Sequence, residues 1–120
     1  RVSISMDKHY DLTYLHQVFH GQEAKVRRIV ALFVARAEVL DRQMMACIRQ
    51  SRLFDLHPVA TTLSAGVRML GLSSLEPLVQ DIERCSKERV DMHRLPALVS
   101  QLHGSLNAVC TSMSQDLARS

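Results

Sequence analysis

Apolar residues recur every three or four positions along most of the chain, the spacing that places side chains on one face of an α-helix. The longest such stretch, 22–49, contains no Gly or Pro, and a shorter one, 11–19, precedes it and ends before Gly21. We predict a helix over each range. The longer helix has an apolar stripe of Val26, Ile29, Val30, Phe33, Ala37, Leu40, Met44, Cys47 and Ile48, and a water-facing side of Lys25, Arg28, Arg36, Asp41, Arg42 and Gln43.

The three prolines mark the starts of three further helices, because proline is tolerated only in a helix's first turn, where its missing N–H has no partner to lose. Pro58, Pro77 and Pro96 predict helices over about 55–70, 74–88 and 92–118, with Asp55 and Ser74 as N-terminal caps of the first two. Gly71 fits the end of the first of these helices. Their apolar stripes are Leu56, Val59, Ala60, Leu63, Val67 and Leu70; Leu75, Leu78, Val79 and Ile82; and Leu95, Leu98, Val99, Leu102, Leu106, Val109, Met113 and Leu117.

Four amphipathic helices with short connections predict an all-α protein, an antiparallel up-down-up-down four-helix bundle with a short N-terminal helix. The aromatic fraction of 4% indicates aliphatic packing, and four Gly with three Pro are too few for the turns of an all-β fold. With 120 residues there is room for one core. We expect one domain over 8–120, preceded by linker or added residues over 1–7.

Charge and cysteine content favour a cytoplasmic protein that does not bind nucleic acid or enter the membrane. The net charge of +3 is scattered, although a basic face around Arg27 and Arg28 leaves nucleic-acid binding as a less favoured alternative. The three cysteines lie far apart at helical spacing, as buried reduced thiols do, and no apolar run is long enough to span a bilayer. We expect no cofactor.

No motif in the chain indicates an independent enzyme or a metal centre. A phosphate-binding glycine loop, a pair of catalytic carboxylates and a CxxC motif are all missing from the sequence. His16 and His20 are spaced to share a helix face, but no third ligand is evident, so we interpret them as solvated, and His93 and His103 likewise.

The outward face of the predicted 55–70 helix is unusual in its small side chains. If the apolar stripe faces the core, the residues His57, Thr61, Ser64, Ala65 and Arg68 lie on the other side. Such a face normally carries long Glu and Lys side chains. Gly66 inside this helix costs about 0.5–1 kcal/mol relative to Ala, so close approach of another surface must compensate. That surface is either a neighbouring helix of the chain itself or a partner protein.

From position 61, the pattern Thr-x-Leu-Ser-Ala-x-x-x-x-Leu-Gly resembles the motif of histidine phosphotransfer domains, His-x-Leu-Lys-Gly or Ser followed by an apolar residue and Gly. The resemblance extends over about 8–118. It implies a four-helix bundle that receives a phosphoryl group from an aspartate of a receiver domain and passes it on. Thr61 stands where the family has its phosphorylated histidine, and Ser64 where it commonly has a lysine.

The resemblance therefore implies a degenerate member, a phosphorelay domain that docks a response-regulator receiver or a sensor-kinase domain without carrying phosphate, because a threonine hydroxyl is a weak nucleophile unless a base activates it. The expected docking residues are His57, Thr61, Thr62, Ser64, Ala65, Gly66 and Arg68. Two alternatives stay open: phosphotransfer rescued by His57, one turn before Thr61, with Arg68 as the cation, or a purely structural spacer or dimerisation module.

Overall fold

The structure, a computed structural model, describes residues 10–119 and is helical throughout this range, with no strand in it. The expected linker over 1–7 lies outside the described residues. The elements are α1 (Thr13–Val18), α2 (Glu23–Arg49), α3 (Leu56–Met69), α4 (Glu76–Glu88) and α5 (Leu95–Arg119), with short 3-10 turns η1 (Leu53–Asp55) before α3 and η2 (Met92–Arg94) before α5. The predicted all-α class is confirmed, and the order of the helices is the predicted one.

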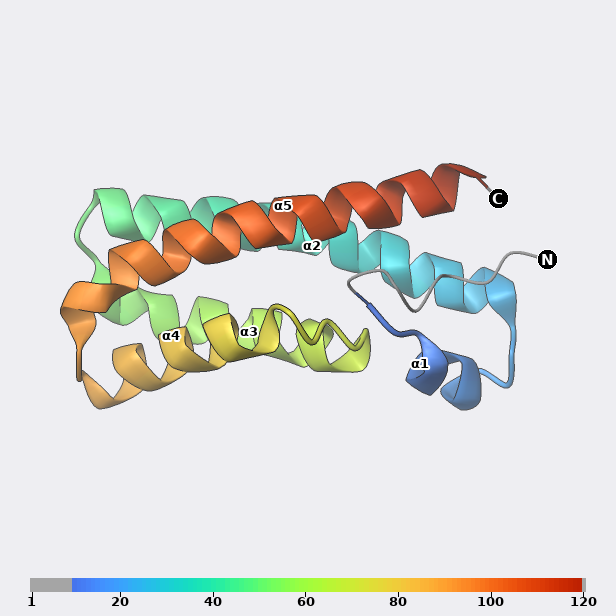
Figure 1. Cartoon of the computed structure of the whole chain (residues 1–120), viewed down its shortest axis with the longest axis horizontal. Helices are drawn as coiled ribbons and strands as arrows, with labels where there is room; N and C mark the ends of the chain where they lie inside the picture. Colours follow the sequence, from blue (N-terminus) through green and yellow to red (C-terminus); the bar gives the residue numbers. More distant parts are fainter. Residues whose placement is uncertain (1–9, 120) are drawn as a thin grey trace.

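Helices α2 to α5 form an antiparallel bundle in which α2 packs against α5 and α3 against α4, while α2–α3 and α4–α5 contacts close the ring (Figure 1). The helices are unequal: α2 and α5 have 27 and 25 residues, whereas α3 and α4 have 14 and 13. The long pair therefore extends beyond the short pair in a molecule that measures 46 × 23 × 21 Å. At that end α1 lies beside α2 (Figure 1). Leu15 of α1 and Leu12, just before it, are buried.

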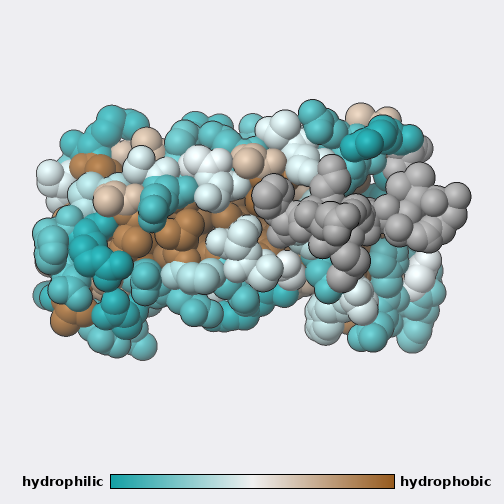
Figure 2. Space-filling view, viewed as in Figure 1, coloured by the Kyte–Doolittle hydropathy of each residue, from teal (hydrophilic) through white to brown (hydrophobic). Residues whose placement is uncertain are grey.

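The core is aliphatic, as the composition indicated, and every member of the four predicted stripes is buried or packs against the buried cluster. On the face drawn in Figure 2, where α5 passes in front of α2, hydrophobic residues form a band between the two helical layers with hydrophilic residues on both sides. Cys47 and Cys85 are buried, Cys110 is half-buried, and all three thiols are free. No helix within 10–119 combines the length and apolarity needed to cross a bilayer.

The predicted side-chain caps are wrong, although the prolines mark the starts of helices as expected. Asp55 does precede α3, but its side chain makes no cap bond and lies 3.7 Å from the guanidinium of Arg52 instead. Helix α4 begins after Leu75, not after Ser74. Here the carbonyl of Leu72 accepts from the N–H groups of Leu75 and Glu76, so backbone satisfies donors that a serine cap would otherwise bond.

Gly71 ends α3, as predicted, with a left-handed backbone at φ +60°. The N–H of Leu72 donates to the carbonyl of Val67 and that of Gly71 to the carbonyl of Arg68, the pair of bonds that closes a helix C-terminus. A Cβ at position 71 would lie 2.7 Å from the carbonyl oxygen of Asp11, whose N–H donates to Leu70. Glycine is therefore required here both for the turn and for the close approach of the segment before α1.

Candidate functional site

Thr61, Thr62, Ala65 and Arg68 are exposed on α3 and form a strip of mostly small side chains, which we call the α3 strip. The Thr62 hydroxyl donates to the carbonyl of Pro58 in its own helix at 2.9 Å, so this side chain lies against the helix. The strip therefore leaves α3 open to close contact from outside, with Arg68 as its one cation.

Ser64 does not belong to this strip, and the prediction that it faces outward is wrong. It is 3% exposed, one turn after buried Ala60 and three residues before buried Val67. Helix α3 packs against both α2 and α4, so its buried arc is wider than the single stripe assumed from the sequence. A polar residue at the edge of that arc is therefore enclosed.

His57 is half-buried at the edge of the α3 strip and is tied to α4. Its Nδ1 lies 3.2 Å from the carbonyl oxygen of Glu83. Because a carbonyl oxygen only accepts, Nδ1 carries a proton, and in the neutral ring Nε2 then holds the lone pair. The ring is thus held over the boundary between α3 and α4 and not over Thr61.

Gly66 allows close packing between α3 and α2. A Cβ at this position would lie 2.6 Å from a ring carbon of Phe33, closer than any real contact. Of the two surfaces considered for Gly66, the protein's own neighbouring helix is therefore present, and the ring of Phe33 compensates for the glycine. Gly66 is half-buried and lies beside the α3 strip.

A groove of about 380 Å³ runs between α2 and α3 next to the strip, and we call it the α2–α3 groove. Its lining is mostly apolar: Ile29, Leu32, Phe33, Arg36, Ala37, Leu40, Thr62, Leu63, Ala65, Gly66 and Met69. Leu32, at its rim, is 53% exposed. The groove and the strip share Thr62 and Ala65, so together they make one continuous surface.

The contribution of α2 to this surface was missed from the sequence, which assigned that helix a core stripe and a wet side only. The signal was present in Leu32, an apolar residue off the core stripe that lines the groove; Val39, seven positions later on α2, does not line it. Both are exposed in the structure.

On the opposite side of α2, Asp41 and His103 form a pair between α2 and α5, and the expectation that Asp41 faces water is wrong. Asp41, expected in water, is only 9% exposed. His103, expected to be solvated, is partly exposed. Its Nδ1 lies 2.7 Å from Oδ2 of Asp41 and 3.0 Å from Oδ1. A partner on the neighbouring helix stabilises the carboxylate that burial would otherwise disfavour.

Cys110 lies near this pair and is a poor nucleophile. Burial, and after it the carboxylates of Glu38 and Asp41, raise the pKa of the Cys110 thiol from 9.0 to about 11. Within 10–119, no three His, Cys, Asp or Glu side chains are grouped so as to hold a metal ion. His16 instead lies 4.0 Å from the carboxylate of Glu23.

Comparison with known proteins defines the class of fold. No protein-family model and no curated protein sequence matches the chain. Among solved structures, it is similar to histidine-containing phosphotransfer protein B from Pseudomonas aeruginosa PAO1, with a TM-score of 0.82 over 97% of this chain and 99% of that one. The two sequences are 22% identical, so the likeness shows that the chain has the fold of that phosphotransfer protein.

Proposed function

We propose that this chain is a phosphorelay domain of the histidine phosphotransfer type that docks the receiver domain of a response regulator and carries no phosphoryl group at position 61. The observation that carries the proposal is the continuous surface formed by the α3 strip and the α2–α3 groove. The fold supports it, because the similar solved structure is that of a histidine-containing phosphotransfer protein.

The docking surface combines apolar area with positive charge. Burial of an exposed side chain such as Leu32 contributes about 1.5–3 kcal/mol to binding before the entropic cost of association. Arg36 at the groove and Arg68 on the strip are cations that complement the acidic site of a phosphorylated aspartate. Small side chains at Thr61 and Ala65 let that site approach the helix closely.

Thr61 does not relay phosphate, for a chemical reason. An alcohol needs an adjacent base to become a nucleophile, whereas the neutral imidazole nitrogen is one near neutral pH. His57, one turn earlier on α3, is held at the boundary between α3 and α4 by its contact with the carbonyl of Glu83, so it is not placed to act as that base. The domain would then act by competition for the receiver or as a scaffold, which is binding and not catalysis.

The docking surface is tested by titrating the isotope-labelled protein with candidate receivers and, separately, with sensor-kinase domains. We expect backbone shifts in 61–68 and around Leu32 on receiver binding. Ala65→Glu should raise the Kd roughly tenfold or more, because it places a carboxylate in the contact. Ala108→Glu changes another exposed alanine, on α5, and is the control; it should change the Kd less than about twofold. If no receiver or kinase shifts the backbone signals of these residues at saturating concentration, the result favours the structural spacer or dimerisation role.

The chemistry at position 61 is tested with a phosphorylated receiver and the variant Thr61→His. The natural protein should take up no phosphate on α3, whereas Thr61→His should acquire acid-labile phosphate because an imidazole now stands on the docking strip. Acid-labile phosphate on α3 of the natural protein, lost in His57→Ala, would refute inertness and establish rescue by His57.

A further inference from the structure

The seam between α2 and α5 contains a second histidine whose surroundings suit a nucleophile. His103 lies on α5 with its side chain 39% exposed, and Asp41 lies across the seam on α2 with its side chain 13% exposed. Both carboxylate oxygens are within 3.0 Å of the same ring nitrogen, Nδ1. The carboxylate is thus fixed by its helix and directed at one edge of the imidazole.

This contact fixes the tautomer of the ring. An ionised carboxylate only accepts, so Nδ1 carries a proton, and in the neutral ring Nε2 then holds the lone pair. Nε2 lies 3.4 Å from the amide nitrogen of Asn107, one turn further along α5. That amide group is a hydrogen-bond donor beside the nucleophilic atom. Asp41, His103 and Asn107 therefore form a chain in which a carboxylate orients a partly exposed imidazole, the arrangement that activates histidine.

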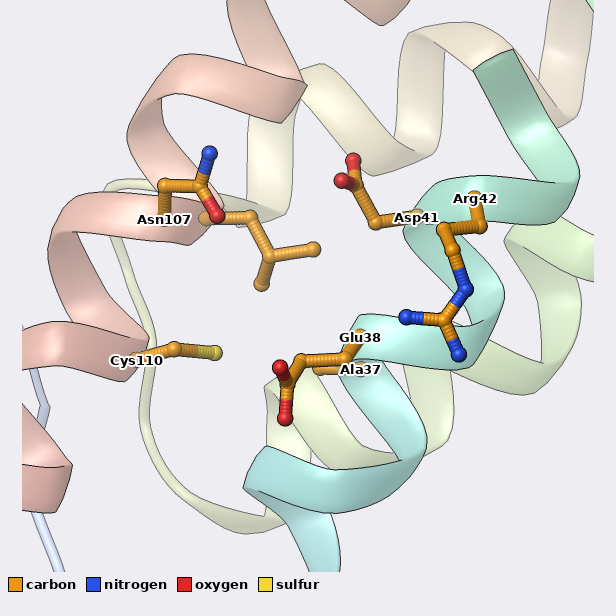
Figure 3. A pocket seen from close by; sticks show the side chains of 7 residues that line it. Ala37, Glu38, Asp41, Arg42, Asn107 and Cys110 are labelled. Atoms are coloured by element: carbon orange, nitrogen blue, oxygen red, sulfur yellow. The ribbon is translucent and has the colours of Figure 1, made fainter. Parts of the chain in front are cut away.

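A hollow of about 190 Å³ lies next to this chain; Asp41 and Asn107 line it, whereas His103 itself does not. Figure 3 shows side chains of α2 and α5 around it, with Asn107 and Cys110 facing Glu38, Asp41 and Arg42. The guanidinium of Arg42 attracts an anion, whereas the carboxylate of Glu38, one turn earlier on α2, repels it. The raised pKa of Cys110 keeps that thiol protonated near neutral pH, so it does not compete with the imidazole.

We propose that His103 is a phosphoryl-accepting residue, modified at Nε2 by activated phosphoryl donors. The Nε2 lone pair forms a bond to phosphorus, and the bond from phosphorus to the leaving group breaks with its electron pair. With phosphoramidate the leaving group is ammonia. The nitrogen of the zwitterionic donor already carries three protons, so the step transfers no proton. The ring retains its Nδ1 proton and becomes cationic, and the Asp41 carboxylate stabilises that charge. Asn107 then donates to the phosphoryl oxygens.

The site is independent of docking at the α3 strip, so its test uses a small donor in place of a receiver. The whole protein is incubated with phosphoramidate, and the phosphorylated residue is located by mass spectrometry under conditions that preserve phosphohistidine. We expect His103 to be labelled faster than the other histidines, with His103→Gln reducing the label there to background. A receiver that fails to bind would leave this result unchanged.

Two variants separate an activated histidine from one that is merely accessible. Asp41→Asn should slow labelling of His103 roughly 10- to 100-fold, the effect of losing one charge-assisted hydrogen bond in the reaction's transition state. His93→Gln, a change at an exposed histidine in η2, should leave the rate at His103 unchanged. Circular dichroism and reactions well below the unfolding temperature ensure that both variants are compared in the folded state.

A second measurement does not depend on reaction. Long-range proton–nitrogen spectra of the ring should show the Nδ1–H tautomer for His103 in the natural protein and a change in the tautomer mixture in Asp41→Asn. The proposal is overturned if His103 carries its proton on Nε2, if Asp41→Asn labels at the natural rate, or if phosphate appears on His57 or another histidine in preference to His103.

Discussion

Helix α2 is bordered by two hollows of opposite character. The α2–α3 groove holds about 380 Å³ and is lined mainly by leucine, isoleucine, phenylalanine and small side chains, with Arg36 at its edge. The hollow toward α5 holds about 190 Å³ and is bordered by Glu38, Asp41, Arg42 and Asn107. Ala37 lines both hollows, so they meet at one position of α2.

The two hollows therefore suit two different functions on the same helix. An apolar groove next to small side chains gains free energy from burying another protein's surface. A polar hollow gains nothing from that, but the buried Asp41 carboxylate beside it holds the His103 imidazole in one orientation. Four changes, taken from the largest expected effect to the smallest, test whether the two sides of α2 are as unlike as they look.

Leu63→Ala should have the largest effect, because it removes the floor of the α2–α3 groove. Leu63 is 1% exposed, and deleting a buried leucine side chain destabilises a core by about 2–5 kcal/mol. Asn107→Ala, on the polar side, should change the free energy of unfolding by less than about 0.5 kcal/mol. Urea unfolding of both variants measures the contrast. A loss below about 1 kcal/mol in Leu63→Ala would show that the groove floor is not part of the cooperative core.

Gly66→Ala should destabilise the protein by about 1–3 kcal/mol, because the added methyl group overlaps the Phe33 ring. In a Phe33→Leu background the overlap is relieved, and the same change should then be neutral or stabilising by up to about 1 kcal/mol, the helix propensity of alanine over glycine. A double-mutant cycle from chemical denaturation gives the coupling between the two positions. Additive effects would mean that Phe33 does not explain the glycine.

Asp41→Asn should destabilise the protein by about 1 kcal/mol through loss of the charged hydrogen bond to His103, a figure reduced because the ring is partly exposed. The same substitution in a His103→Gln background should have a clearly smaller effect. Unfolding curves at low and high salt check the electrostatic origin. Equal losses in the two backgrounds would contradict the pairing.

The effect that is smallest near neutral pH concerns Cys110, because it appears only as the pH rises above about 9. Its pKa is raised from 9.0 to about 11 in the folded protein, so the unfolded chain loses this proton first and stability should fall as pH rises from 9 toward 11. Cys110→Ala should show a shallower fall of stability with pH.

Near neutral pH, alkylation of Cys110 in the native protein should be slow, and Glu38→Gln should speed it by lowering the pKa of the Cys110 thiol. Mass spectrometry of the Cys110 peptide follows the rate, and a Glu38→Gln variant that reacts more slowly would contradict this electrostatic effect.

The fold was accessible from the sequence because every apolar stripe faces a shared interior, and helical spacing alone determines which side chains do so. The helix starts were less accessible. Pro77 marked the beginning of α4, but the cap at Ser74 was wrong because the Leu72 carbonyl satisfies the donors there, a contact that depends on the turn's three-dimensional path.

The surface was predicted in part. Thr61 and Arg68 lie outward as the spacing indicates, whereas Ser64 does not, because the number of helices that α3 contacts cannot be read from α3 itself. The burial of Asp41 likewise depends on His103, 62 positions away on another helix. Periodicity within one helix carries no information on such pairs.

The unequal lengths of the four bundle helices imply a gradient of amide protection along the molecule. Where α3 and α4 flank the long pair, backbone amides of α2 and α5 exchange only when the whole core opens. Beyond them, among the described residues, the long pair is covered on that side by α1, six residues long, and by Tyr10 before it, whose hydroxyl donates to Asp116 of α5. We expect deuterium to enter α2 first around Val26, and a partner that clamps this end would be detected by the protection it adds.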